Sequence, residues 1–465
     1  MDLKYEFKNA WKEAQKDNTI GEIMDYANGY MKFLSKAKTE RVSVEEIVNL
    51  AKSNGFVSLD DVIANGKLNA GDKVYSVNRA KAIALFVIGK NPIEQGMRVV
   101  GGHIDSPRMD LKPNPLYESS NLGFLKTHYY GGIKKYQWTT IPLAIHGVVI
   151  LNDGSKVTVC VGEDDSDPVF CVTDLLVHLA GDQMEKKLKD GVAGEALNVL
   201  VGNVPLDGEE KDPVKANILK LLNEKYNIVE GDFLTAEIEI VPAGKARDMG
   251  FDRSMILGYG HDDRVCSYAA VRAILDIEKP DYTAVALCVD KEEVGSQGNT
   301  GMQSRFFEND VAELIAIQGD YSDIKIRRAM SNTKVLSADV TAGHDPNYAE
   351  AYDKSNSAIM GNGIVLNKYT GARGKGGCND ANAEFIAEIR KIFNSENVIW
   401  QTAELGKVDQ GGGGTIAYIL ANANAEVIDC GVALLNMHAP YEVASKADIH
   451  EMYKGYKAFY MSNFR

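Results

Sequence analysis

Two adjacent glutamates, Glu292 and Glu293, follow a short apolar run at residues 282–289 and the aspartate Asp290. The run is rich in β-forming residues and predicts a buried strand that ends at Asp290. Carboxylates at the mouth of a buried strand are costly unless they are paired or bound to a cation. Adjacent carboxylates can divide two tasks, because one can bind a cation while the other moves a proton. A solvated acidic turn is the alternative, and this stretch taken alone favours it.

A second stretch places a histidine and an aspartate two positions apart. A strand-like run at 97–100 leads into two glycines, which let the backbone turn tightly, and then into His103 and Asp105. If the chain stays extended, these two side chains lie on the same side, and Asp105 can orient a metal-bound His103. A turn with a structural His–Asp hydrogen bond is an equally good interpretation.

Three further polar positions stand at the predicted ends of elements. Asp262 or Asp263 opens a predicted helix, where capping of the N-terminus is the ordinary role. Asp339 lies near the end of a strand predicted over 335–340, and His438 follows the last predicted strand. These positions could also hold a cation.

The elements that must position these residues alternate between strands and helices, which predicts a layered α/β domain. In such domains, ligands collect outside the carboxyl ends of the strands, where the residues above are expected to meet. The main expected elements are helices over 2–54, strands over 73–89, a strand over 313–317 that ends near Asp320, a glycine-rich helix start at 409–415, a strand over 425–430 and a helix over 446–464.

The polar residues suit a dinuclear metal centre. Two imidazoles and several carboxylates, with no thiolate pattern, are a donor set that suits two Zn²⁺ or similar ions. A bridging carboxylate holds two such ions about 3.5–4 Å apart, and a spare carboxylate can deprotonate the bridging water.

The middle of the chain has a different texture. Strand-like runs and acidic turns over 113–243 predict an inserted β-rich domain between two parts of a first domain, 1–112 and 244–465. One histidine of the insert, His178, stands in the apolar stretch 175–180 on a predicted helix. By itself, such a histidine is usually a packing residue.

Composition limits the partners and the compartment. The 465 residues exceed one comfortable domain, and the net charge of -14 argues against nucleic acid or an anionic membrane as main partner. No apolar run approaches transmembrane length, and the start has no basic-then-apolar signal pattern. The six cysteines form no Cys-x-x-Cys pair and are expected to be reduced core residues of a cytoplasmic protein.

The combined motifs resemble the aspartyl aminopeptidases, a family of dinuclear-zinc exopeptidases that assemble as tetrahedral dodecamers built from dimers. The resemblance runs along nearly the whole chain. It implies a three-layer, zinc-exopeptidase-like α/β catalytic domain with a mixed sheet, plus an inserted β-rich dimerisation domain. The matching motifs are Gly102-His103-Ile104-Asp105-Ser106-Pro107, Asp262 at a helix start, Asp290-Lys291-Glu292-Glu293-Val294-Gly295-Ser296, Ser337-Ala338-Asp339, and Met437-His438 with Glu442.

The resemblance also implies a role for each site residue. Glu292 would be the general base, and Asp105 would orient a metal ligand. His178, followed by Leu179, matches a histidine of the family that reaches the neighbouring subunit's active site. The implied metal ligands are His103 and Asp339 as terminal ligands, Asp262 as the bridge, and Glu293 and His438 to complete the two shells.

Three positions depart from the family pattern. Lys291 stands where the family usually has His or Asn, and Ala342 stands where it commonly has His. The family's lysine for acidic side chains aligns with Lys368 only through an insertion, although Arg373 or Lys375 could substitute. The aminopeptidase activity is therefore a firmer expectation than a preference for Asp or Glu.

We predict a metal-dependent aminopeptidase that acts on peptides with a free N-terminus, holds two Zn²⁺ ions (with Co²⁺ or Mn²⁺ as alternatives) and forms a homo-oligomer. A dinuclear deacylase or carboxypeptidase is the enzymatic alternative and would accept N-blocked substrates. A non-catalytic, metal-stabilised scaffold is the alternative from another class, although the base Glu292 is present. A nucleotide-binding module would rest on the glycine run 411–414 alone, whose spacing disfavours it.

Overall fold

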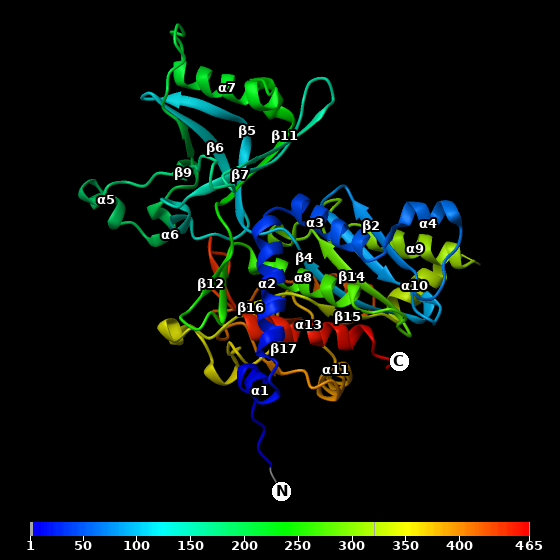
Figure 1. Ribbon diagram of the computed structural model, residues 1–465. Helices are drawn as coiled ribbons and strands as arrows, with labels where there is room; N and C mark the ends of the chain where they lie inside the picture. Colours follow the sequence, from blue (N-terminus) through cyan, green and yellow to red (C-terminus); the bar gives the residue numbers. More distant parts are fainter. Residues whose placement is uncertain (1–2, 320, 465) are drawn as a thin grey trace. The chain divides into compact units, whose positions relative to one another are not determined.

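The computed structural model describes residues 3–319 and 321–464, which form two compact units (Figure 1). The range predicted as an insert, 113–243, lies within the second unit. The first unit comprises Met1–Asp105, Ala246–Met437 and Glu442–Arg465, and the second comprises Ser106–Lys245 and His438–Tyr441.

A nine-stranded mixed sheet forms the centre of the first unit. Strands β14, β4, β15 and β19 are parallel neighbours, whereas β3 runs antiparallel to β2 and β14, and β17 runs antiparallel to β19 but parallel to β18. The central strands are buried, as expected for parallel strands that are covered on both faces. In spatial order the strands are β1 (Val57–Ser58), β2 (Lys73–Asn78), β3 (Ala82–Val87), β14 (Thr283–Val289), β4 (Met97–His103), β15 (Lys334–Ser337), β19 (Glu426–Gly431), β17 (Ile364–Asn367) and β18 (Trp400–Thr402).

Each face of this sheet has its own hydrophobic core, because successive strand residues point to opposite faces. On β3, Ile83 and Leu85 join one core cluster, whereas Ala84 and Phe86 join the other. The predicted three-layer α/β architecture is confirmed. The first cluster contains residues of α2 (Ile20–Lys36), α3 (Glu40–Ser53), α8 (His261–Leu275), α11 (Ala383–Ser395) and α13 (Lys446–Tyr460). The second contains residues of α4 (Leu59–Asn65), α9 (Phe306–Gln318), α10 (Asp323–Ser331) and α12 (Ala417–Asn422). Helix α1 (Ala10–Asp17) precedes all of these in the chain.

One predicted strand is wrong, because residues 313–317 belong to helix α9. Phe307, Val311, Leu314 and Ile315 are buried at the three- and four-residue spacing of a helix. A short apolar run does not by itself distinguish a strand from a buried helix segment. The predicted strand end near residue 320 lies outside the described residues.

A smaller sheet in the first unit brings distant segments to the start of α8. Gly258, near that start, pairs with Glu442 in an antiparallel ladder. This pairing carries the carboxylate of Glu442 from the far end of the sequence to the beginning of the helix. The strands of this sheet are β12 (Arg247–Met249), β13 (Met255–Gly258), β21 (Glu442–Ser445), β20 (Ala433–Leu435) and β16 (Thr341–Ala342).

The second unit contains a seven-stranded antiparallel sheet, and helix α7 (Pro213–Tyr226) contacts its strands. The strands predicted over 156–161 and 235–241 are present to within one residue. The strands are β8 (Lys156–Val161), β7 (Leu143–Ile150), β11 (Ala236–Pro242), β5 (Arg108–Ser119), β6 (Leu122–Tyr130), β10 (Val199–Gly202) and β9 (Cys171–Val172), and the short helices are α5 (Gly181–Met184) and α6 (Leu188–Gly191).

Among the described residues, no helix combines the length and the apolar character that crossing a bilayer requires.

Candidate metal centre

The candidate site begins where two parallel strands end side by side. His103 is the last residue of β4 and pairs in register with Val289, the last residue of β14. Asp105 follows the first strand, and the one-turn 3₁₀ helix Glu292–Val294 follows the second. The carboxyl ends of parallel strands meet at one edge of a sheet, so these residues converge there.

The two glycines before His103 do not form the turn that the sequence predicted, because both lie inside β4. A Cβ atom on Gly102 would stand 2.5 Å from Oδ2 of Asp263 and 3.0 Å from Oγ of Ser267, both on α8. Glycine is therefore needed at position 102 for the close approach of α8 to the strand rather than for a bend.

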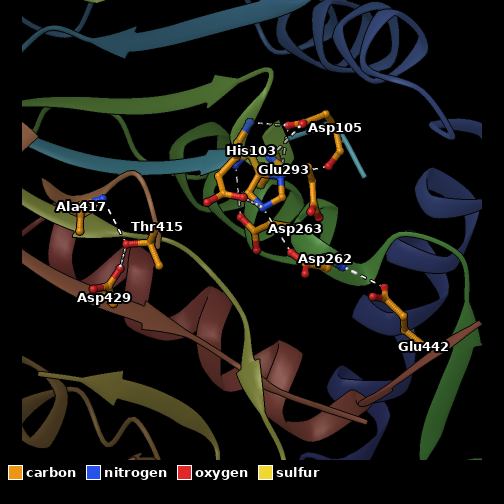
Figure 2. A network of polar contacts seen from close by, with 11 residues as sticks. His103, Asp105, Asp262, Asp263, Glu293, Thr415, Ala417, Asp429 and Glu442 are labelled. Atoms are coloured by element: carbon orange, nitrogen blue, oxygen red, sulfur yellow. Dashed lines mark hydrogen bonds and ion pairs between the residues drawn. The ribbon is translucent and has the colours of Figure 1, made fainter. Parts of the chain in front are cut away.

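His103 is buried between carboxylates on both sides of its ring. Its Nδ1 lies 3.0 Å from the carbonyl oxygen of Asp105 and 3.3 Å from Oδ1 of that residue. Its Nε2 lies 3.2 Å from Oδ1 of Asp262 (Figure 2). The same nitrogen lies 3.8 Å from Oε2 of Glu292. Nδ1 is thus held by a backbone and carboxylate partner, while Nε2 faces the other acidic groups, as in metal-bound histidines.

Asp105 positions more than the imidazole. Its Oδ1 accepts a hydrogen bond from the backbone N–H of Glu292, and its Oδ2 accepts one from Glu293, both at 3.2 Å. One buried carboxylate therefore fixes the ring of His103 and the backbone of both glutamates. The sequence predicted only the first of these tasks.

Asp262 does not cap α8, although capping was the ordinary interpretation of its position. The N-cap residue is Gly260, with φ 75°, and no side chain caps the helix within the described part of the chain. The peptide bond between Asp262 and Asp263 is cis, and Asp262 has non-helical dihedral angles. The backbone N–H of Asp262 donates to Oε2 of Glu442 at 3.0 Å, while its side chain faces His103.

Asp263 is a residue of this site for which sequence patterns predicted no definite role. It is fully buried, and its Oδ2 accepts a hydrogen bond from the backbone N–H of His103 at 3.3 Å. Burial raises the pKa of Asp263 well above its ordinary value. The adjacent Asp-Asp pair at a helix start was the available signal, but spacing could not assign a role to each member.

Asp339 lies two residues beyond the end of β15, which pairs with β4. Burial raises the pKa of Asp339 well above its ordinary value, and the negative charges of Glu292, Asp262 and Asp263 raise it further. The side chain therefore belongs to the same acidic region as the residues after β4 and β14.

The donor set fits a metal ion. His103, Asp262 and Glu293 each offer a ligand atom, and these atoms all lie within 4.8 Å of one another. An imidazole with carboxylates is a set that zinc binds. Several buried carboxylates that converge without a cation are also costly, and a divalent ion would neutralise them.

Comparison with known proteins identifies the family. The family described as aminopeptidase I zinc metalloprotease (M18) matches residues 33–460. The chain belongs to the M18 aminopeptidase family. The aspartyl aminopeptidases that the sequence resembles are this family, so the predicted family, fold class and metallopeptidase class are confirmed.

Individual M18 relatives cover almost the entire chain. A probable M18 family aminopeptidase 1 of Clostridium acetobutylicum is 58% identical over 460 residues, which are 98% of this chain and 99% of that protein. The crystal structure of aminopeptidase I from Clostridium acetobutylicum has a TM-score of 0.93 at 56% identity, covering 99% of this chain and 100% of that one. An M18 aminopeptidase structure from Thermotoga maritima has a TM-score of 0.94 at 47% identity, covering 98% and 99%.

Two histidines that the M18 resemblance implicated lie in the second unit. The ring Nδ1 of His438 is 2.8 Å from the carbonyl oxygen of Gly132, the kind of bond that orients a metal-binding imidazole. His178 is exposed, in a 3₁₀ turn at Val177–Leu179 rather than in the longer helix predicted. Within the described chain, His178 is therefore not packed in a hydrophobic core. The roles of both histidines stay predictions.

Two departures from the M18 pattern have a visible setting. Lys291 has φ 68°, a left-handed conformation in which Asn and His are enriched, which matches the residues that the family usually has there. Nζ of Lys368 lies 3.2 Å from Oδ1 of Asp380, and Nζ of Lys375 lies 2.9 Å from Oδ2 of the same carboxylate. Lys368 is therefore already paired within the chain.

Proposed function

We propose that this M18 aminopeptidase removes N-terminal residues from peptides with Glu292 as the general base. The observation that carries the proposal is the convergence of acidic side chains on Nε2 of His103, beside a glutamate held by Asp105. We propose two divalent ions per chain, first of all Zn²⁺. The residues that would hold them are His103, Asp262, Glu293, Asp339 and His438.

When bound, the metal centre supplies an acidified water and polarises the scissile carbonyl. Glu292 would take a proton from the attacking water and pass it to the leaving amine. The exposure of Glu292 supports its assignment as the base. Its side chain is 15% exposed, whereas the side chains of His103 and Asp262 are 2% and 5% exposed. A proton carrier must reach both the site and the substrate, and a ligand need not.

Substrate preference is a separate part of the proposal. Lys368 and Lys375 share the single carboxylate of Asp380, so one positive charge of the three groups is uncompensated. This charge would favour acidic N-terminal residues, although weakly, because both lysine side chains are nearly half exposed and screened by water.

We also propose a cytoplasmic homo-oligomer in which the second unit mediates dimerisation and His178 reaches the neighbouring site. There it would donate a hydrogen bond to the tetrahedral oxyanion. One structural neighbour, 20% identical with a TM-score of 0.75, is described as the mApe1 dodecamer of Saccharomyces cerevisiae. The six free cysteines are compatible with a reducing compartment.

The test is the release of free amino acids from unblocked dipeptides and from their N-acetylated controls. The protein is first stripped of metal and then given Zn²⁺, Mn²⁺ or Co²⁺. We expect metal-dependent cleavage of the unblocked peptides alone, with acidic first residues cleaved somewhat faster. Cleavage of the acetylated controls would support a deacylase instead, and no cleavage by a protein loaded with metal would support a scaffold.

A further inference from the structure

The second unit carries a row of reactive side chains that the proposed peptidase activity does not use. Residues paired directly across neighbouring strands project from the same face of a sheet. The row crosses five strands and consists of Cys160 on β8, His146 on β7, Glu239 on β11, Asp110 on β5 and His128 on β6. The opposite face is apolar, so the row is a distinct polar feature of this unit.

Three groups at the edge of this sheet form a nucleophile, base and carboxylate series. Cys160 lies on the edge strand β8 and is exposed. His146, opposite it, is only 4% exposed, and its Nε2 lies 2.8 Å from Oε1 of Glu163. Cys160 is the direct cross-strand partner of His146, so the two side chains project from the same face as neighbours. The imidazole thus lies beside a solvent-facing sulfur and is held by a carboxylate, the order of groups with which a base and its orienting partner assist a nucleophile.

The charge of His146 follows from these two neighbours. Burial by itself lowers the pKa of the imidazole, but the neighbouring Cys160 and Glu163 outweigh this effect and raise the pKa to about 9. Other titratable groups face the same region. Burial and Glu163 raise the pKa of Tyr441, and Glu239, opposite His146, lies 3.3 Å from Arg108. Glu163 is therefore the carboxylate that holds the imidazole, while the carboxylate of Glu239 is paired with Arg108.

The other cysteines have different surroundings and so provide internal controls. Cys266, Cys288 and Cys430 are buried. The thiol of Cys171 donates to the carbonyl oxygen of Val172 at 3.2 Å, and that of Cys378 donates to the carbonyl oxygen of Lys375 at 3.3 Å. The thiols of these two cysteines contact backbone carbonyl oxygens, so both serve as comparisons for Cys160. The expectation that the cysteines are core residues fails at Cys160.

We propose that Cys160 is a reactive modification site, activated by His146 and positioned through Glu163, that exchanges with low-molecular-weight disulfides. The sulfur of Cys160 attacks one sulfur of the disulfide, the S–S bond breaks, and a mixed disulfide forms at Cys160. The departing thiolate takes up the proton that Cys160 and His146 shared. The reaction needs only the disulfide as co-reactant, and no electrons are gained or lost overall.

The test measures the rate of mixed-disulfide formation at each cysteine of the full chain with glutathione disulfide, by peptide mass spectrometry. At pH 7 we expect Cys160 to react on the order of tenfold faster than Cys171 and Cys378, because an unassisted thiol is mostly protonated there. His146→Gln should remove this advantage at pH 7 and leave the rate of Cys160 unchanged at pH 10, where an ordinary thiol is ionised without help.

Glu163→Gln provides a second variant that keeps the imidazole and most of its packing. It should lower the rate of Cys160 at pH 7 by less than His146→Gln does, and leave Cys171 and Cys378 unchanged. A Cys160 rate equal to that of Cys171, or a rate that neither variant alters at pH 7, would overturn the proposal. Circular dichroism of each variant checks that the unit remains folded.

Discussion

At the residue scale, Glu292 and Glu293 are neighbours with different surroundings. Asp105 holds the backbone N–H of both, so a single carboxylate sets their positions. Glu293 joins His103 and Asp262 in the donor cluster, whereas Glu292 reaches within 3.8 Å of Nε2 of His103 without belonging to that cluster. The two adjacent residues are therefore proposed for different tasks, Glu293 as a ligand and Glu292 as the base.

Replacing each glutamate separately tests this division. Glu292→Gln should retain bound metal but lower kcat by about 10²–10⁴-fold, because the amide cannot accept the proton of the water. Glu293→Gln should instead lose metal, and activity should return in part at high metal concentration. Metal content by atomic emission and kcat on a dipeptide are the two readouts. Normal turnover by Glu292→Gln would remove Glu292 as the base.

The glycine before His103 offers a second test at this scale. Gly102→Ala places a Cβ within 2.5 Å of the Asp263 carboxylate, so α8 or the strand must move, at a cost of about 1–3 kcal/mol. We expect a lower melting temperature and weaker metal binding. Gly101→Ala is the matched control, because its nearest contact is an ordinary 3.4 Å to Ile416. Equal effects of the two substitutions would contradict the role of the close approach.

At the scale of elements, helix α9 packs against the sheet with a buried carboxyl group. Asp310 is 6% exposed, and its Oδ1 accepts a hydrogen bond from Oγ of Ser76 on β2 at 3.0 Å. Burial raises the pKa of Asp310 to about 7, with a lowering contribution from Ser76. The folded protein therefore holds a proton on Asp310 that the unfolded chain releases near its ordinary pKa of 3.8.

This shift predicts the pH dependence of stability. A pKa raised in the folded state gives a contribution that is complete below pH 3.8 and is lost as the pH rises through 7. Between pH 5 and 8 the free energy of unfolding should fall by roughly 1–3 kcal/mol more in the wild type than in Asp310→Asn. Urea denaturation across this range measures the difference, with the half-exposed Glu308→Gln on the same helix as control. Parallel curves for wild type and Asp310→Asn would show that Asp310 is ionised in the folded state.

At the scale of the whole molecule, the proposed active site could be formed by one chain or by two neighbouring chains. His178 is exposed in the described chain, with exposed apolar neighbours Leu176, Val177 and Leu179. An exposed apolar stretch around a histidine is understandable if another subunit covers it. If His178 serves the neighbouring subunit's site, peptidase activity requires the homo-oligomer.

Mixed oligomers test this dependence. His178→Ala and Glu292→Gln homomers should each be nearly inactive, although metal content stays normal. After joint refolding at equal amounts, about a quarter of wild-type activity should appear, because one site in four combines an intact Glu292 with a neighbour's intact His178. No recovery, in samples shown to be mixed by mass spectrometry, would mean that each chain supplies its own site.

Local sequence patterns were sufficient to predict the layered fold and the positions after strands where the polar residues stand. Alternation of strands and helices, and the apolar run before Asp290, are such patterns, so they predicted β14 and the glutamates that follow it. The motif set also sufficed to identify the family, because several short motifs in a fixed order are far more specific than any one alone. The strand predicted over 313–317 was wrong for a local reason, because a short apolar run is compatible with a strand or with a buried helix.

What each polar group touches became known only from the packed structure. The roles of Gly102, Asp105 and Asp263 depend on contacts between residues about 160 to 190 positions apart in the chain, and no spacing rule encodes such contacts. The same holds for the row that places Cys160 beside His146, which strand register sets. Sequence patterns report which face of an element is buried. The packing of distant elements, driven by that burial, determines which polar atoms then lie within reach of one another.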